Sequence, residues 1–413
     1  MRTDKILSPV TNLISNALRD LRLTMTQIQS FEESLPKNEA GPMDATAVLT
    51  AVETNLLARK DYHRLFDAKM MQVRQQMGLP VTRPASLAGI PAENETAYRQ
   101  AYLNAAREIG QLFLDDGRLP DAWAYFRTIG EPKPVQDAIE KIAIPGEPDA
   151  AFDEILNLAL YEGAHYVRGL YFLLKTHGTC NTVTAMGQLM PQMSPDERQQ
   201  AAAMMVQNIY SDLQRSVRHD VESRMPVLNG KATLSELISG REWLFENGNY
   251  HIDVSHLHAT VGFARHLNSD APELQQAIEL AEYGSRLAEP LRYPADVPFD
   301  DYYNGHLHFL HAIAGINPED SLQYFIDRLN AEPDEPDKKL IAFVVVDLGQ
   351  RIGQLSQALE VAAPFLNRLE DPAGFSFTEA CVDANRLDLL EQFARENDDI
   401  LSMATVLLTR KAD

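Results

Sequence analysis

The spacing of apolar residues constrains this chain most strongly, because it recurs every three or four positions along most of the 413 residues. Side chains at that spacing share one face of an α-helix, whereas a half-buried strand alternates apolar and polar residues. Alternating runs are nearly absent. The pattern therefore predicts an all-α protein. The clearest helical stretches are 6–31, 45–57, 62–77, 98–113, 152–160 and 201–217.

Capping and helix-breaking residues mark where these helices begin and end. Ser194-Pro195 and Asn317-Pro318 each place a polar capping residue before a proline and two acidic residues, an order typical of a helix start. The densest group of breakers lies between residues 78 and 91. We therefore predict an N-terminal helical region over residues 1–90 and a second region over 91–413. Glycines expected to end helices are Gly117, Gly178, Gly248 and Gly353.

The segment from Ile109 to Pro134 carries a spaced motif of small and large residues. Its members are Ile109, Gly110, Phe113, Gly117, Leu119, Ala122, Phe126 and Pro134. In this order and spacing they resemble the tetratricopeptide repeat (TPR), in which small residues let two helices approach and large ones fill the groove. Ala106 stands where the family has a tryptophan. A weaker second copy comprises Gly353, Leu355, Ala358 and Phe365, and segments 256–290 and 306–333 keep only the hairpin shape.

This resemblance implies a right-handed α-α superhelix of stacked helical hairpins, a TPR-like α-solenoid, over residues 91–413. A non-repetitive helical bundle is the alternative interpretation. Stacked hairpins of this family enclose a concave groove that usually holds a peptide or a partner helix.

The formal charge of −22 limits the partners of such a groove. An acidic surface repels phosphate backbones and anionic membranes, so we expect neither nucleic acid nor membrane binding. A peptide or protein partner with basic or neutral groups fits this charge. The two cysteines form no CxxC motif, and the N-terminus lacks the apolar core of a signal peptide. These features predict a cytoplasmic protein.

Histidines recur in matching contexts at the starts of three expected helices. His165, His256 and His306 each follow a turn, and Asp253 and Tyr303 precede the latter two by three positions. Residues three apart share a helical face, so the TPR register would place all five on the concave surface as a ligand-binding set. His258 and His308 lie about 200° round the helix from their neighbours and are expected to face the adjacent helix.

Three interpretations of this histidine register remain open. Glu162, His165, Asp253, His256 and His306 would be metal ligands in a metal-dependent enzyme that uses iron, zinc or manganese, because carboxylate-x-x-His pairs on facing helices bind such metals. Histidines near helix starts would alternatively hold an anionic group. In the third interpretation the residues are structural, with Asp253 simply capping the helix that begins at Val254.

The leading functional prediction is a non-enzymatic TPR-like binding or scaffold protein with a groove lined by histidine and carboxylate. The metal-dependent enzyme is the alternative. Phosphate-binding loops, the HExxH motif, the GxSxG elbow and the kinase motifs are all missing from the sequence, which argues against nucleotide-driven chemistry and the familiar hydrolases.

Overall fold

The computed structural model describes residues 28–29, 31–32, 35, 44–225, 230–366 and 375–410. Within these ranges every regular element is a helix, which confirms the all-α prediction. The predicted helix over 6–31 lies almost entirely outside the described residues. By its internal contacts the chain forms two compact units, unit 1 (Met1–His165) and unit 2 (Tyr166–Asp413).

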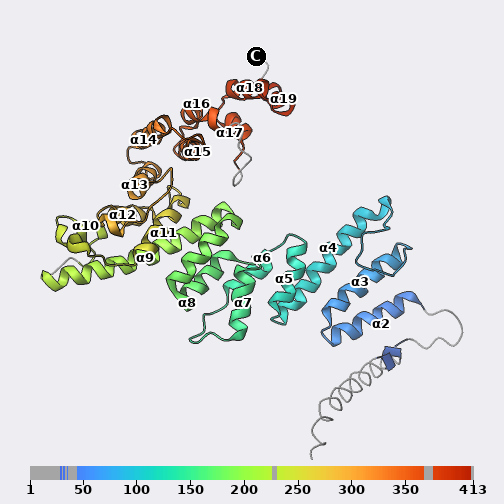
Figure 1. Ribbon diagram of the computed structural model, residues 1–413. Coiled ribbons are helices and arrows are strands. Elements are labelled where there is room, and N and C mark those ends of the chain that lie inside the picture. The colour runs from blue at the N-terminus through green and yellow to red at the C-terminus, as the bar shows by residue number, and fades with distance from the viewer. Residues whose placement is uncertain are drawn as a thin grey trace, which may run out of the picture. The chain divides into compact units, whose positions relative to one another are not determined.

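Unit 1 consists of helices most of which pack against the next one along the chain (Figure 1). They are α2 (Ala45–Ala58), α3 (Tyr62–Gln76), α4 (Ala92–Asp115), α5 (Leu119–Thr128), α6 (Lys133–Glu140) and α7 (Ala150–Leu160). Helices α2 to α6 pack in this order, each against its neighbour in sequence, whereas α7 packs against α5. The breaker segment 78–91 contains no helix. It folds over the buried Arg74, whose guanidinium donates to the carbonyls of Pro80, Pro84 and Ser86. The predicted boundary at residue 90 therefore falls on a connection inside unit 1, and the boundary itself stays a prediction.

Unit 2 continues with helices of more varied length. They are α8 (Tyr166–Leu189), η1 (Met190–Gln192), α9 (Pro195–Arg224), α10 (Leu234–Ile238), η2 (Glu242–Gly248), α11 (Val254–Phe263), η3 (Ala264–His266), α12 (Leu274–Ser285), η4 (Glu289–Leu291), α13 (Tyr302–Ile313), α14 (Pro318–Ala331), α15 (Glu335–Arg351), α16 (Leu355–Leu366), α17 (Phe377–Asp383), α18 (Leu387–Glu396) and α19 (Ile400–Thr409). No described helix combines the length and the apolar character needed to cross a membrane.

The predicted helix ends meet three different outcomes. Ser194 caps α9 through a complete capping box with Glu197, as predicted. Gly178 interrupts α8 as predicted, because its backbone is not helical (φ 81°, ψ 180°) and two helical stretches meet there at a kink. Asn317 does precede α14, but it adopts a left-handed conformation in which its side chain makes no capping bond.

One turn geometry recurs at the junctions between paired helices. In α4–α5, Gly117 has φ +73° and the next amide, of Arg118, donates to the carbonyl of Phe113 at 2.9 Å. Gly353 repeats this geometry in α15–α16 with φ +75°. Lys60, Asn385 and Asp398 occupy the same left-handed position before α3, α18 and α19. This hydrogen bond from the second residue after the helix back to its last turn is the Schellman motif, and the next helix begins one residue later.

Close packing inside the hairpins follows the small residues of the TPR-like motif. A Cβ atom added at Gly110 would lie 2.7 Å from the ring of Phe126, and Phe113 and Ala122 are completely buried beside them. Gly349 of α15 meets Ala358 of α16 equally closely. The described helices thus pack in neighbouring pairs, an arrangement compatible with a helical repeat.

The contact between α12 and α13 generates a prediction about stability. A Cβ at Gly284 would lie 2.1 Å from the ring of Tyr303, which is buried and held inside unit 2. We expect Gly284→Ala to lower the free energy of unfolding by about 1–3 kcal/mol, as overpacking does. Urea denaturation of the full chain measures this change.

Gly187→Ala is the matched control, because Gly187 lies in α8 with no atom within 4 Å of its added Cβ. Alanine is the better helix former by about 0.8–1 kcal/mol, so this variant should be as stable as the wild type or more so. Equal losses in both variants would contradict the close contact.

Candidate ligand pocket

The residues predicted to form a common site are divided between the two units, because Asp253, His256, Tyr303 and His306 belong to unit 2. Glu162 and His165 lie in unit 1, after α7. His165 Nε2 is 2.9 Å from Glu140 Oε1, and the carbonyl of Glu162 accepts a hydrogen bond from Trp123 Nε1. These contacts are all local to unit 1.

Asp253 has the structural role that was one of the three interpretations. Its carboxylate caps α11 and accepts hydrogen bonds from the Ser255 amide at 2.9 Å and the Ser255 hydroxyl at 2.6 Å. The Ser255 hydroxyl, with smaller contributions from main-chain amides and His256, keeps the pKa of Asp253 below its ordinary value. The Asp253 carboxylate is therefore already engaged in capping α11.

Tyr303 and His306 are both buried, at 3% and 1% exposure, but they face different surroundings. Tyr303 fills the space above Gly284 against α12. His306 lines a pocket of about 680 Å³. Of the five predicted residues, only His306 lines this pocket within the described part of the chain, so the predicted common site on one surface stays a prediction.

The prediction for His258 and His308 is confirmed. The His258 ring stacks on Tyr302 of the adjacent helix α13, with ring centres 3.7 Å apart and an interplanar angle of 15°. His308 stacks in the same way on Tyr324 of α14 at 4.0 Å and 12°. Helical geometry alone was sufficient to place these two side chains.

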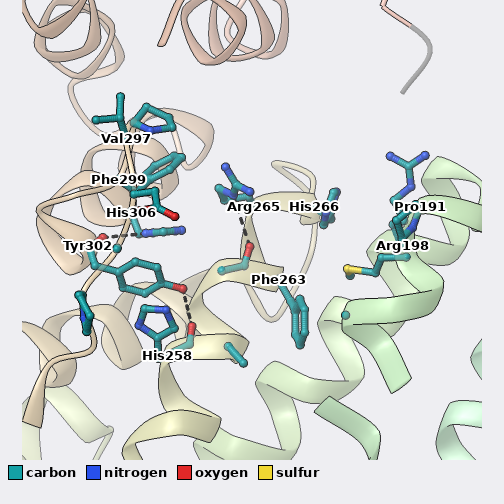
Figure 2. A pocket seen from close by; sticks show the side chains of 18 residues that line it. Pro191, Arg198, His258, Phe263, Arg265, His266, Val297, Phe299, Tyr302 and His306 are labelled. Atoms are coloured by element: carbon teal, nitrogen blue, oxygen red, sulfur yellow. Dashed lines mark hydrogen bonds between the residues drawn. The ribbon is translucent and has the colours of Figure 1, made fainter. Parts of the chain in front are cut away.

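We name the cavity beside His306 the α11–α13 pocket. It is bounded by the end of α8 with η1, the start of α9, helices α11 and η3, the connection before α13, and α13 itself (Figure 2). Its lining residues are Gly187, Met190, Pro191, Arg198, His258, Ala259, Gly262, Phe263, Arg265, His266, Pro294, Ala295, Asp296, Val297, Pro298, Phe299, Tyr302 and His306.

Four rings contact one another in sequence along one wall of this pocket, two pairs stacked and the middle pair tilted by 44°. Phe299 lies 4.2 Å from His306, His306 lies 4.3 Å from Tyr302, and Tyr302 lies 3.7 Å from His258, all measured between ring centres. The Tyr302 hydroxyl donates to the main-chain carbonyl of His258. Gly262 allows this approach, because a Cβ there would lie 2.7 Å from that hydroxyl oxygen. The wall is thus fixed by packing and by a main-chain contact.

The same wall fixes the tautomer of His306. Its Nδ1 lies 2.7 Å from the carbonyl oxygen of Tyr302, which can only accept, so Nδ1 carries the proton. Burial, with the nearby Arg265, lowers the pKa of His306 to about 3, and the ring is neutral. Nε2 is then an acceptor. It is buried and has no hydrogen-bond partner among the described residues.

Two arginines also line the pocket, and one of them contacts this wall. The Arg265 guanidinium lies 4.7 Å from the centre of the Phe299 ring, and its Nε donates to the Gly262 carbonyl at 3.4 Å. Arg198 donates through Nε to the Met193 carbonyl at 3.0 Å. Neither has a carboxylate within 4 Å among the described residues. Both carry positive charge into a pocket whose one acidic lining residue, Asp296, is exposed.

A smaller cavity of about 350 Å³ adjoins the pocket, because Arg198, Arg265 and His266 line both. On its far side Arg351 donates to the Arg265 carbonyl at 2.7 Å and lies 3.5 Å from Asp347. Burial, with the charges of the three arginines, lowers the pKa of His266 to about 4. Three arginines and the carboxylates of Asp196 and Asp347 thus line this smaller cavity.

Sequence reasoning did not identify the arginines of the site. Arg265 and His266 follow the histidine-rich stretch directly, which was the available signal. Arg198 reaches the pocket only through the packing of α9 against α11 and η3. Within the described ranges, no three His, Cys, Asp or Glu side chains are grouped as metal ligands would be.

Comparisons with known proteins add no relative to this picture. No protein-family model matches the chain, and no curated protein or solved structure matches it significantly.

The neutral state of His306 generates a prediction about pH. Its pKa of about 3 lies below the ordinary value of 6.5, so the unfolded chain binds the proton more readily between these values. Stability is therefore fully present above about pH 6.5 and falls as the pH drops towards 3, with a slope of about 1.4 kcal/mol per pH unit from this one residue.

The variant His306→Phe tests this contribution, because phenylalanine retains a ring in the stack but cannot take up a proton. Urea denaturation between pH 7 and 4 should show a shallower loss of stability in the variant than in the wild type. An unchanged slope would mean that His306 is protonated as easily in the folded as in the unfolded chain.

Proposed function

We propose that this chain is a TPR-like helical-repeat binding protein whose ligand occupies the α11–α13 pocket. The repeated Schellman turns and the glycine-to-aromatic packing within hairpins support the repeat assignment, and with it the right-handed superhelix that the sequence predicted. The proposal concerns binding. It assigns no reaction to the chain.

The unpartnered Nε2 of His306 is the observation that carries the proposal. A buried acceptor without a hydrogen bond costs about 1–3 kcal/mol, and protein interiors rarely retain one without a reason. Here the ring that carries the acceptor is held by the main-chain hydrogen bond of Nδ1, by the stacked ring of Phe299 and by the tilted ring of Tyr302. Figure 2 draws the imidazole between Phe299 and Tyr302, with its edge towards Arg265. A ligand donor that reaches Nε2 would offset this cost.

The volume and lining of the pocket also suit a ligand. A cavity of about 680 Å³ lies within the range of about 300–1,000 Å³ found for small-molecule sites. Its walls are mostly apolar or aromatic, with a few polar groups in fixed orientations, which is the usual composition of such sites.

The predicted protein partner and the predicted metal chemistry both stay predictions. A peptide or protein partner with basic or neutral groups remains consistent with the charge of −22 and would bind outside the pocket. The metal-dependent alternative has no grouped set of ligands among the described residues to support it.

A pocket-filling variant tests the proposed function. Ala259 lines the pocket in the middle of α11, so Ala259→Phe would occupy space that a ligand needs. We expect at least one compound of a broad metabolite panel to raise the melting temperature of the wild-type chain but not of this variant. Saturation at about 100 times Kd stabilises by about 2.7 kcal/mol, a shift that is measurable in a thermal scan.

Ala331→Phe is the control, because Ala331 is an exposed residue at the end of α14 in the same unit. It should respond to the compound as the wild type does. If no compound distinguishes Ala259→Phe from Ala331→Phe, the pocket is not a binding site and the proposal is wrong.

A further inference from the structure

We infer that the ligand of the α11–α13 pocket is a small organic anion, whose carboxylate or phosphate oxygens pair with Arg198 and Arg265 and whose body donates an O–H or N–H to His306 Nε2. This inference rests on the proposed function and specifies its ligand class.

The two arginines lack the partners that arginines usually have in this unit. Most other arginines of unit 2 lie within 4 Å of a carboxylate, as Arg215 does with Asp212 and Arg351 with Asp347. Carboxylates are abundant in a chain of net charge −22. Arg198 and Arg265 nevertheless have none within that distance among the described residues. Asp347 acts on Arg265 electrostatically, but neither arginine has a carboxylate at ion-pair distance among the described residues.

Both guanidinium groups also use the same nitrogen for their main-chain hydrogen bond. Each uses Nε for a main-chain carbonyl, Arg265 for Gly262 and Arg198 for Met193. The terminal nitrogens Nη1 and Nη2 of both side chains make no hydrogen bond to any described residue. Arg265 is further held against the Phe299 ring. Paired terminal N–H groups match the spacing of two oxygens on a carboxylate or phosphate, which they bind in a bidentate manner.

The histidines define a second requirement for the ligand. His306 is neutral with its proton on Nδ1, so Nε2 accepts and would repel an anionic oxygen. A bare inorganic anion would satisfy the arginines but leave Nε2 without a donor. Phe299 contacts both groups, with the Arg265 guanidinium 4.7 Å and the His306 ring 4.2 Å from its centre. One molecule that spans this ring would reach both.

An anion would also change the charge state of His266. The charged groups around it are the cations Arg198, Arg265 and Arg351, which with burial lower its pKa to about 4, and the carboxylates of Asp196 and Asp347, which line the same cavity. A bound anion would offset the charges of these arginines and raise that pKa. Binding near pH 5 should therefore be accompanied by proton uptake.

Four probes separate the two requirements. 4-Hydroxybenzoate has an anion and a donor, 4-methoxybenzoate has the anion without the donor, and 4-hydroxybenzamide has the donor without the anion. Glycerol 3-phosphate supplies the phosphate alternative to the carboxylate. Titration calorimetry with the full chain at low ionic strength measures the affinity of each probe. Either 4-hydroxybenzoate or glycerol 3-phosphate should bind more tightly than both incomplete probes, and which of them does so shows whether the pocket prefers a carboxylate or a phosphate.

Arginine variants identify the contacts. Arg265→Gln and Arg198→Gln should each weaken the better anionic probe by roughly 10- to 100-fold, the loss expected for a charge-assisted hydrogen bond. Arg265→Lys keeps the charge but removes the paired donors, and it provides a second variant if the glutamine change impairs folding. Arg215→Gln is the control, because Arg215 lies on the same helix as Arg198 with its side chain 75% exposed. It should bind as the wild type does.

The outcomes distinguish this inference from the proposed function. In one outcome, a neutral or cationic compound binds the wild type but not Ala259→Phe, and binds Arg265→Gln and Arg198→Gln as tightly as the wild type. That result would overturn the inference and leave the binding function in place. Equal binding of 4-hydroxybenzoate and 4-methoxybenzoate would remove the role of His306. If no compound binds the wild type more tightly than Ala259→Phe, the proposed function is wrong and the inference is wrong with it.

Discussion

A main-chain hydrogen bond at the ends of the helices determines how the rest of the structure is arranged. Where one residue takes a left-handed conformation, the amide after it bonds to a carbonyl five positions back, as Arg118 does with Phe113 and Gln354 with Gly349. The last turn is thereby closed and the next helix begins at once, so the two helices must lie side by side. Small residues such as Gly110 then allow the contact to tighten. A local backbone constraint thus produces the hairpins, and the apolar faces of the hairpins produce the core.

The α11–α13 pocket lies where this regular pattern is interrupted. α11 ends in the short helix η3, and a connection of ten residues (292–301) separates η4 from α13, so the neighbouring helices cannot close on each other as they do in the regular hairpins. Side chains from these irregular segments, Arg265 and Phe299 among them, face the resulting cavity. Binding residues often occur on such connections, because a rigid scaffold positions them without requiring them for its own packing.

Much of the local structure could be predicted from the sequence, and the reason is that it depends on short-range rules. Helical spacing, the cap at Ser194, the cap at Asp253 and the direction of His258 and His308 towards the adjacent helix all follow from residues a few positions apart. The set of side chains that line the pocket does not follow from such short-range rules. A helical register gives the direction of a side chain but not its neighbour, so Tyr303 and His306 were assigned to one surface although Tyr303 packs against Gly284. Arg198 comes from a helix 67 positions earlier than Arg265, and no local pattern connects them.

Net charge illustrates the same distinction between long and short range. The charge of −22 is a property of the whole surface, and its influence on a ligand decays over about 8 Å at physiological ionic strength. Inside the pocket the nearest groups decide, and these are two arginines without carboxylate partners and histidines that remain neutral because of burial and those arginines. The net charge therefore predicts which large partners the outer surface would repel. The sign of a bound small molecule depends instead on which side chains the fold leaves without a partner.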